Sequence, residues 1–339
     1  MIAVTFRAVA EDLPGTVLQH EFQRTWPAYR VWYLREGEAA RPSYVACRQA
    51  LRQHLPELLP TWERLVELVG GGDLEARFLS LFDPPPFLAG CTQALWTHCS
   101  PALIRNYDYA PRQFDGLILR SAFNGTANVA MSDCVWGVLD GVNAHGLAVS
   151  LAYGGRHRIG HGFAITVVLR YVLEFCASVA EAVAVLKRVP VHVAYNLALL
   201  DAHGRHATVF IAPDRPPRIE PWLVSANRQA EDARPDEPSV QDSALREAVV
   251  QARLFDPSAG LEQIVQSFLT EPVWRDPALH GWGTLYTACY RPAERSLQLR
   301  WHGSEWRQSV AEFTPGERTI RFPAGGRHRP RHPPGSHPH

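Results

Sequence analysis

A cysteine that follows a glycine, soon after a run of prolines, is the feature of this 339-residue sequence that most suggests chemistry. The prolines occupy residues 84–86, and the pair is Gly90 and Cys91. A thiol is a good nucleophile only as a thiolate, and a cysteine in mid-chain has no base beside it to take its proton. Cleavage of the Gly90–Cys91 bond would free an α-amine, whose ordinary pKa of about 8 suits it to act as that base. We therefore interpret Cys91 as the nucleophile of a chain that cleaves itself.

The residues around this bond support the interpretation. Glycine at position 90 tolerates a strained backbone and leaves room for attack by the thiol. Arg105 and Asp108 follow in the run Arg-Asn-Tyr-Asp. An arginine near a thiol favours the thiolate, and an aspartate can orient a new α-amine. The alternatives are that Cys91 is an ordinary buried apolar residue and that Arg105 and Asp108 form an ordinary ion pair at a strand end.

The segment before Cys91 predicts a mostly helical unit. After a strand-like run at 1–9 and mixed turn chemistry to about residue 30, apolar residues recur at helical spacing over 46–69, and a short helix is expected over 74–82. The consecutive prolines then favour an extended chain. We expect residues 1–90 to deliver Cys91 at the start of a strand.

The segment after Cys91 predicts short strands interrupted by two helix pairs. The helices are expected at 162–176, 178–188, 243–254 and 261–269, with Ser178 and Glu181 forming a capping box. The strands are expected at 92–96, 102–104, 116–121, 127–132, 136–139, 147–152, 193–200, 207–211, 222–226, 284–290 and 296–301. The composition of residues 140–146 predicts a tight turn. Hairpins outnumber helical crossovers, so we predict an α+β protein with mostly antiparallel sheets.

Composition excludes several function classes. Lys plus Arg and Asp plus Glu each total 34, so no net charge attracts nucleic acid or a membrane surface. No leader-like N-terminus and no membrane-length apolar run is seen, which makes a cytoplasmic location the expectation. The six cysteines contain no C-x-x-C pair that would indicate a zinc site: Cys47, Cys91, Cys99, Cys134, Cys176 and Cys289. Residues 323–339, rich in Arg, His and Pro, are expected to be a disordered tail.

Four segments, in order, resemble the acyl-CoA:6-aminopenicillanic acid acyltransferase family, peptidase family C45. They are residues 90–93, 105–109, 140–150 and 195–201, within a similarity that spans about residues 50 to 301. That family is akin to choloylglycine hydrolases and penicillin V acylases. The resemblance implies a four-layer αββα Ntn-hydrolase sandwich.

The resemblance also implies roles for particular residues. Cys91 would be the nucleophile, Arg105 and Asp108 would border it, and Arg246 would be the late arginine of the superfamily's active site. Tyr153 and Asn227 match the positions that supply the two oxyanion-hole donors, the tyrosine through its main-chain amide. Asn227 is also a candidate turn residue, and Arg246 a candidate surface arginine. Asn196 competes with Asn227 but is better explained as a buried structural amide.

These implications define the expected protein. Residues 1–90 would form an N-terminal pro-region or α-subunit, and 91–322 a catalytic β-subunit, in a self-cleaved heterodimer. The enzyme would hydrolyse or transfer the acyl group of a small-molecule linear amide through a thioester, with no cofactor or metal. Trp96, Trp136, Tyr107 and Tyr153 hint at an apolar acyl pocket, although core packing explains such aromatic residues equally well. The sequence leaves the acyl group, the amine and the choice between water and amine as acceptor open.

Three other interpretations remain. One is an uncut papain-type hydrolase with His145 or His161 as the base. Another is a catalytically silent binding module. The third is a zinc enzyme that uses His157 and His161, although the loop around them gives no fixed helical face for two ligands.

Overall fold

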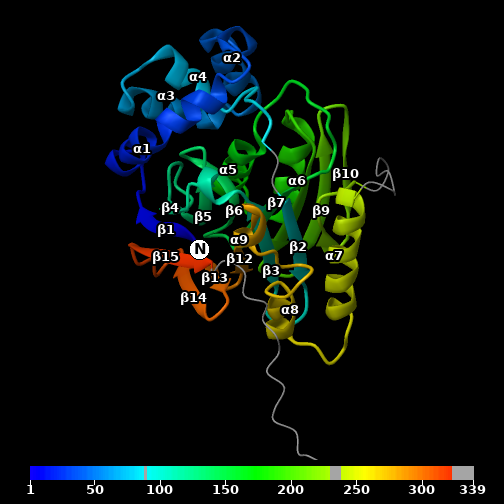
Figure 1. Cartoon of the computed structure of the whole chain (residues 1–339). Helices are drawn as coiled ribbons and strands as arrows, with labels where there is room; N and C mark the ends of the chain where they lie inside the picture. The colour runs from blue at the N-terminus through cyan, green and yellow to red at the C-terminus, as the bar shows by residue number, and fades with distance from the viewer. Residues whose placement is uncertain (88–89, 230–237, 323–339) are drawn as a thin grey trace, which may run out of the picture.

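The computed structural model describes residues 1–87, 90–229 and 238–322 and builds two large sheets that pack face to face (Figure 1). The predicted tail at 323–339 and part of the predicted loop at 231–242 lie outside the described residues. Within the described residues, no helix is both long and apolar enough to cross a membrane.

The first sheet has nine strands, which are antiparallel to their neighbours except at one parallel pair, β1 with β4. Its spatial order is β10 (Arg215–Glu220), β9 (His206–Ala212), β8 (Tyr195–Asp201), β7 (Leu147–Tyr153), β6 (Gly137–Asn143), β5 (Asn128–Asp133), β4 (Leu117–Ser121), β1 (Ile2–Ala10) and β15 (Gly316–Phe322). Both ends of the described chain therefore meet in this sheet.

The second sheet has six strands, all antiparallel to their neighbours. Its order is β11 (Val224–Ser225), β2 (Gly90–Trp96), β3 (Ala102–Tyr109), β12 (Gly283–Arg291), β13 (Ser296–Trp301) and β14 (Ser304–Ser309). Strands β2 and β3 face β7 and β8, and β12 and β13 face β6. The strand that begins at the Gly90–Cys91 bond thus lies against the other sheet.

Helices cover the outer faces. On the nine-stranded sheet lie α5 (Ile165–Phe175) and α6 (Val179–Arg188), and on the six-stranded sheet lie α7 (Pro238–Leu254) and α8 (Leu261–Ser267). The side chain of Ser178 accepts a bond from the Glu181 amide, which is one half of the expected capping box; the Glu181 carboxylate accepts from the Ala177 nitrogen and not from the Ser178 nitrogen. The α+β class and the αββα layering expected from the sequence are confirmed.

The N-terminal helices gather at one end of the sandwich (Figure 1). They are α1 (Thr16–Tyr33), α2 (Tyr44–His54), α3 (Leu59–Leu68) and α4 (Asp73–Leu79), with 3-10 turns at Glu38–Ala40 and Pro56–Leu58. Within this unit Phe22, Trp26, Tyr29 and Tyr33 of α1 surround Phe78 of α4. The unit is not wholly helical, because its first strand is part of the nine-stranded sheet.

Some sequence expectations were wrong. The 18-residue helix α1 was missed, and so were β10, β14, β15, the short helix α9 (Pro277–His280) and the 3-10 turn at Pro111–Gln113. Residues 140–143, expected in a turn, continue strand β6, and the turn itself is left to residues 144–146. The side chains of Asp140 and Asn143 are fully buried and hydrogen-bonded there, which overrides their preference for turns.

Candidate active site

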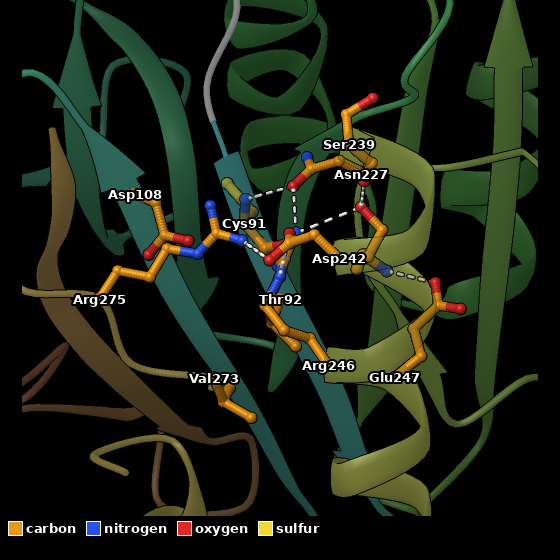
Figure 2. Close-up of polar contacts among 12 residues, drawn as sticks. Cys91, Thr92, Asp108, Asn227, Ser239, Asp242, Arg246, Glu247, Val273 and Arg275 are labelled. Carbon is orange, nitrogen blue, oxygen red and sulfur yellow. Dashed lines mark hydrogen bonds and ion pairs between the residues drawn. The ribbon is translucent and has the colours of Figure 1, made fainter. Parts of the chain in front are cut away.

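Cys91 lies on β2 just where the neighbouring strand β11 has ended. The paired residues of the two strands are Ala94 with Val224 and Gln93 with Ser225. Beyond Ser225 side chains replace the missing strand: Asn227 Oδ1 accepts a 2.8 Å bond from the Cys91 main-chain nitrogen. Arg246 Nη1 donates to the Cys91 carbonyl oxygen at 2.7 Å. Both main-chain groups of Cys91 on this side are thus held by side chains (Figure 2).

The position of Asn227 is fixed from several directions. Its own amide nitrogen donates to the Tyr153 carbonyl oxygen at 2.9 Å. Asn196 donates to the carbonyl oxygens of Ala226 and Arg228, on either side of Asn227, at 2.7 and 2.9 Å. The structure therefore agrees with a structural role for Asn196, and it places Asn227 rather than Asn196 against Cys91.

Arg105 approaches the sulfur of Cys91 from β3. Its Nη2 lies 3.2 Å from Cys91 Sγ, and its Nη1 pairs with Asp140 of the opposite sheet. Burial raises the pKa of the Cys91 thiol above its ordinary value, although the charge of Arg105 acts to lower it. Burial therefore disfavours the thiolate in the continuous chain, and the thiol needs a base before it can react.

Asp108 lies beside the bond in front of Cys91. It is the cross-strand partner of Gly90, and one carboxylate oxygen accepts a 2.7 Å bond from Thr284 Oγ1. Its other oxygen, Oδ2, is buried and has no hydrogen-bond partner among the described residues. Burial raises the pKa of Asp108, opposed by the charge of Arg246. A buried acceptor without a donor is costly unless a donor arrives.

Arg246 is not a surface residue, although its place on α7 left that alternative open. It is 1% exposed and also donates to Thr92 Oγ1 and, at 3.1 Å, to Asn227 Oδ1. Asp242, one turn earlier on α7, accepts from Arg246 Nε at 3.0 Å and pairs with Arg275 (Figure 2). This ion-pair chain connects α7 with the segment just before α9.

A cavity of about 860 Å³ adjoins this cluster. The residues around it include Gly90, Tyr153, Asn227, Arg246 and Trp282. A Cβ atom on Gly90 would lie 2.5 Å from the Trp282 ring, so the visible requirement for glycine here is steric. Cys91 itself is 0% exposed, and the cavity approaches it from the Gly90 side.

The structure brings the six predicted site residues together through direct contacts or strand pairing. Other candidates lie elsewhere or play another part. His145 and His161 are exposed, His161 is bonded to Asp83 at 2.8 Å, and in the described part of the chain no hydrogen bond joins a histidine to Cys91. His157 borders the cavity, but across the described ranges no group of three His, Cys, Asp or Glu side chains could hold a metal ion.

Of the four aromatic residues proposed for an acyl pocket, Tyr153 borders the cavity. Trp96 and Trp136 are buried in the core, and Trp136 donates to the Leu79 carbonyl oxygen. The Tyr107 ring lies 4.8 Å from the Arg105 guanidinium carbon, which makes it a support of that arginine.

Sequence reasoning missed the residues that surround this cluster. Asp140 was assigned to a turn, and Asp242, Arg275 and Trp282 carried no motif. Tyr286 and Tyr290 both donate to Asp140. They stand four residues apart in a predicted strand, a spacing that places two phenols on one face and could have revealed them.

Several solved structures are distantly similar. The N-acylethanolamine-hydrolyzing acid amidase ortholog of Caenorhabditis elegans is 17% identical, covers 60% of this chain and 93% of its own, and has a TM-score of 0.45. A mutant conjugated bile acid hydrolase from Clostridium perfringens is 13% identical, with coverages of 69% and 97% and a TM-score of 0.46. Penicillin V acylase from Agrobacterium tumefaciens is 14% identical, with coverages of 70% and 93% and a TM-score of 0.46. Likenesses this distant give no information about the site.

No curated protein matches the sequence significantly. The family model described as acyl-coenzyme A:6-aminopenicillanic acid acyl-transferase matches residues 96–306, more than half of the chain. The matched region begins after Cys91 and includes Arg105, Asp108, Asn227 and Arg246. The match confirms the resemblance stated above, and the chain belongs to the acyl-coenzyme A:6-aminopenicillanic acid acyl-transferase family.

Proposed function

We propose that this chain is an N-terminal-cysteine amide hydrolase or acyltransferase that activates itself by cleaving the Gly90–Cys91 bond. The observation that carries the proposal is that the main-chain nitrogen and the sulfur of Cys91 each have a different side-chain partner. Asn227 Oδ1 lies 2.8 Å from the nitrogen of Cys91, and Arg105 Nη2 lies 3.2 Å from its sulfur. A partner for the future amine and a partner for the future thiolate are thus both in place.

The self-cleavage is an N-to-S acyl shift followed by hydrolysis. Cys91 Sγ adds to the Gly90 carbonyl carbon, the thiol proton passes to the Cys91 nitrogen, and the C–N bond breaks. Gly90 is then held as a thioester on Cys91. The break of the C–N bond frees the α-amine of Cys91, and water then adds to the thioester and releases the Gly90 carboxylate and the Cys91 thiol.

Turnover uses the same atoms. The α-amine takes the thiol proton, and the thiolate adds to the carbonyl carbon of the substrate amide. The departing amine leaves with the proton that the α-ammonium returns. The acyl group remains as a thioester on Cys91 until water or a second amine accepts it, which distinguishes hydrolysis from acyl transfer.

The surrounding residues orient the new amine. Asn227 Oδ1 accepts one of its N–H bonds, as it accepts the main-chain N–H of the continuous chain. Asp108 Oδ2, buried without a donor among the described residues, is available for another. Two acceptors suit an α-amine, which has more than one N–H to donate, better than a peptide nitrogen, which has only one. The arrangement therefore supports an amine as the functional group at Cys91.

Transition-state stabilisation follows the roles that the family resemblance implies. The Tyr153 main-chain N–H and the Asn227 side-chain amide would donate to the oxyanion. In the continuous chain one N–H of Asn227 Nδ2 donates to the Tyr153 carbonyl oxygen. Arg246 keeps Asn227 and Cys91 in register by bonding both.

The two cleavage products would remain together. The N-terminal product carries β1, which is hydrogen-bonded between β4 and β15 of the remaining chain. Loss of that strand would expose two sheet edges, which is unfavourable. We therefore propose an α/β heterodimer of residues 1–90 and 91–339, and we expect a small-molecule amide or acyl donor as substrate.

The test is substitution of the nucleophile. Cys91→Ala should yield an uncut chain without amidase activity, whereas Cys91→Ser should cut slowly because a hydroxyl remains. Gel electrophoresis measures cleavage, and release of amine from a panel of N-acyl amino acids, dipeptides and penicillin V measures activity. Wild-type activity in the Cys91→Ala protein would refute the proposal, and so would unchanged cutting. Activity in an uncut wild-type chain would instead favour the papain-type mechanism.

A further inference from the structure

Arg105 divides its guanidinium between the nucleophile and a buried carboxylate of the opposite sheet. One terminal nitrogen reaches Cys91 Sγ at 3.2 Å, and the other pairs with Asp140 and also donates to the Leu139 carbonyl oxygen at 3.1 Å. The side chains of Arg105 and Asp140 are both 0% exposed. In such a site the positive charge of Arg105 is shared rather than directed wholly at the sulfur.

Asp140 is itself held by two phenols from β12. Tyr286 donates to its Oδ2 at 2.7 Å, and Tyr290 donates to its Oδ1. Burial first, and the charge of Asp140 second, raise the pKa of both tyrosines well above the ordinary value. The phenols therefore stay protonated as donors, and each hydrogen bond disperses part of the carboxylate charge.

We propose that Asp140, with Tyr286 and Tyr290, is a positioning cluster that sets how strongly Arg105 favours the thiolate of Cys91. The carboxylate opposes the thiolate by compensating Arg105, and the phenols weaken that opposition. The cluster touches no substrate and acts through Arg105. Its consequence for turnover depends on the proposed function, whereas its effect on the thiol does not.

Other charged groups near the thiol remain constant in the variants below. Asp108, on the same strand as Arg105, raises the pKa of the thiol. Arg246, from α7, bonds the Cys91 carbonyl oxygen rather than the sulfur. In the cleaved chain the α-amine of Cys91 also titrates beside the thiol.

The proposal predicts opposite signs for two substitutions. Asp140→Asn removes one negative charge but leaves Arg105 two further acceptors, the Leu139 oxygen and the Tyr286 hydroxyl. The thiol pKa should fall by about one unit, giving about tenfold more thiolate at a fixed pH below it. Tyr290→Phe removes a donor from Asp140, so the pKa should rise, with about threefold less thiolate.

A matched control lies in α5. Arg170 and Glu174 form another fully buried pair, 3.3 Å apart, but neither bonds a cysteine in the described part of the chain. Glu174→Gln should therefore leave the thiol titration unchanged. Any effect common to this variant and Asp140→Asn reports general loosening of the core.

The experiment is a pH titration of full-length protein labelled with carbon-13 at the cysteine Cβ atoms, observed by NMR. The Cys91 signal is assigned from its loss in Cys91→Ser. Shifts of opposite sign in Asp140→Asn and Tyr290→Phe, with none in Glu174→Gln, support the proposal. Equal thiolate fractions in wild type and both variants overturn it, as do shifts of the same sign. Should Asp140→Asn fail to fold, the sign in Tyr290→Phe alone decides.

Turnover measurements separate this proposal from the proposed function. If the chain is uncut and inactive but the two shifts are opposite, the positioning cluster stands and the N-terminal-cysteine mechanism fails. If the chain is cut and active but no shift is seen, the reverse holds. In active protein the acidic limb of the kcat/KM profile should move in the same directions as the titration, whereas a merely structural role would lower kcat/KM equally at every pH.

Discussion

Two fully buried arginine–carboxylate pairs in this molecule have the same chemistry but different surroundings. Arg170 lies on α5 with Glu174 one turn later, and Arg170 also bonds the Trp136 carbonyl oxygen and the side chains of Ser121 and Asn128. Arg105 instead crosses from one sheet to the other and gives one nitrogen to a sulfur. The comparison indicates that burial of an ion pair does not by itself mark a site. The partner that distinguishes Arg105 is the cysteine.

Breaking the Arg105–Asp140 pair should affect catalysis most. Arg105→Met removes the cation beside Cys91 Sγ, and kcat/KM should fall by about 100- to 1,000-fold, the usual cost of losing one charge-stabilising donor. Steady-state kinetics on the cleaved fraction measure this loss. Activity within about threefold of wild type would show that Arg105 is structural, as we expect Arg170 to be.

Breaking the Arg170–Glu174 pair should affect stability instead. Arg170→Met leaves Glu174 buried without its cation, and the free energy of unfolding should fall by about 3 kcal/mol. Denaturant unfolding measures this change. The folded fraction should keep the wild-type kcat/KM, and a large loss of activity in well-folded Arg170→Met protein would erase the contrast between the two pairs.

A smaller effect concerns pH. Burial raises the pKa of Glu174, although Arg170 opposes the shift. A raised carboxyl pKa contributes stability that is fully present below the unfolded value of about 4.3 and is lost as pH rises through the folded value. Wild type and Glu174→Gln should therefore be similarly stable near pH 4. At higher pH the free energy of unfolding of the wild type should fall relative to that of Glu174→Gln. Parallel curves of unfolding free energy against pH would contradict this.

Much of the fold was predictable from the sequence because local signals agreed with the tertiary structure. Apolar periodicity and the Ser178 capping box located α2, α3, α5 and α6, and the hairpin residues located β8 and β9. Helix α1 was missed because Pro27 lies inside it and no side chain caps it, although Phe22, Trp26, Tyr29 and Tyr33 follow helical spacing. Its stability comes from packing on Phe78, a residue far along the chain.

The site was predictable where residue types carried the chemistry themselves. Cys91, Arg105 and Asp108 were named from their residue types and spacing, and Asn227 and Arg246 from the family resemblance. The structure brings these residues together. Asp140 was wrongly assigned to a turn because the composition of residues 140–146 is typical of turns. Its burial depends on residues 286 and 290, which only the folded chain brings near.

The most direct test of the account follows cleavage and activity together in the same preparation. Mass spectrometry quantifies chains that begin with Cys91 carrying a free α-amine, while amine release from an amide substrate is measured at each time. We predict that activity rises in proportion to that fraction and is absent before the cut. Full activity while the Gly90–Cys91 bond is still intact would contradict the account.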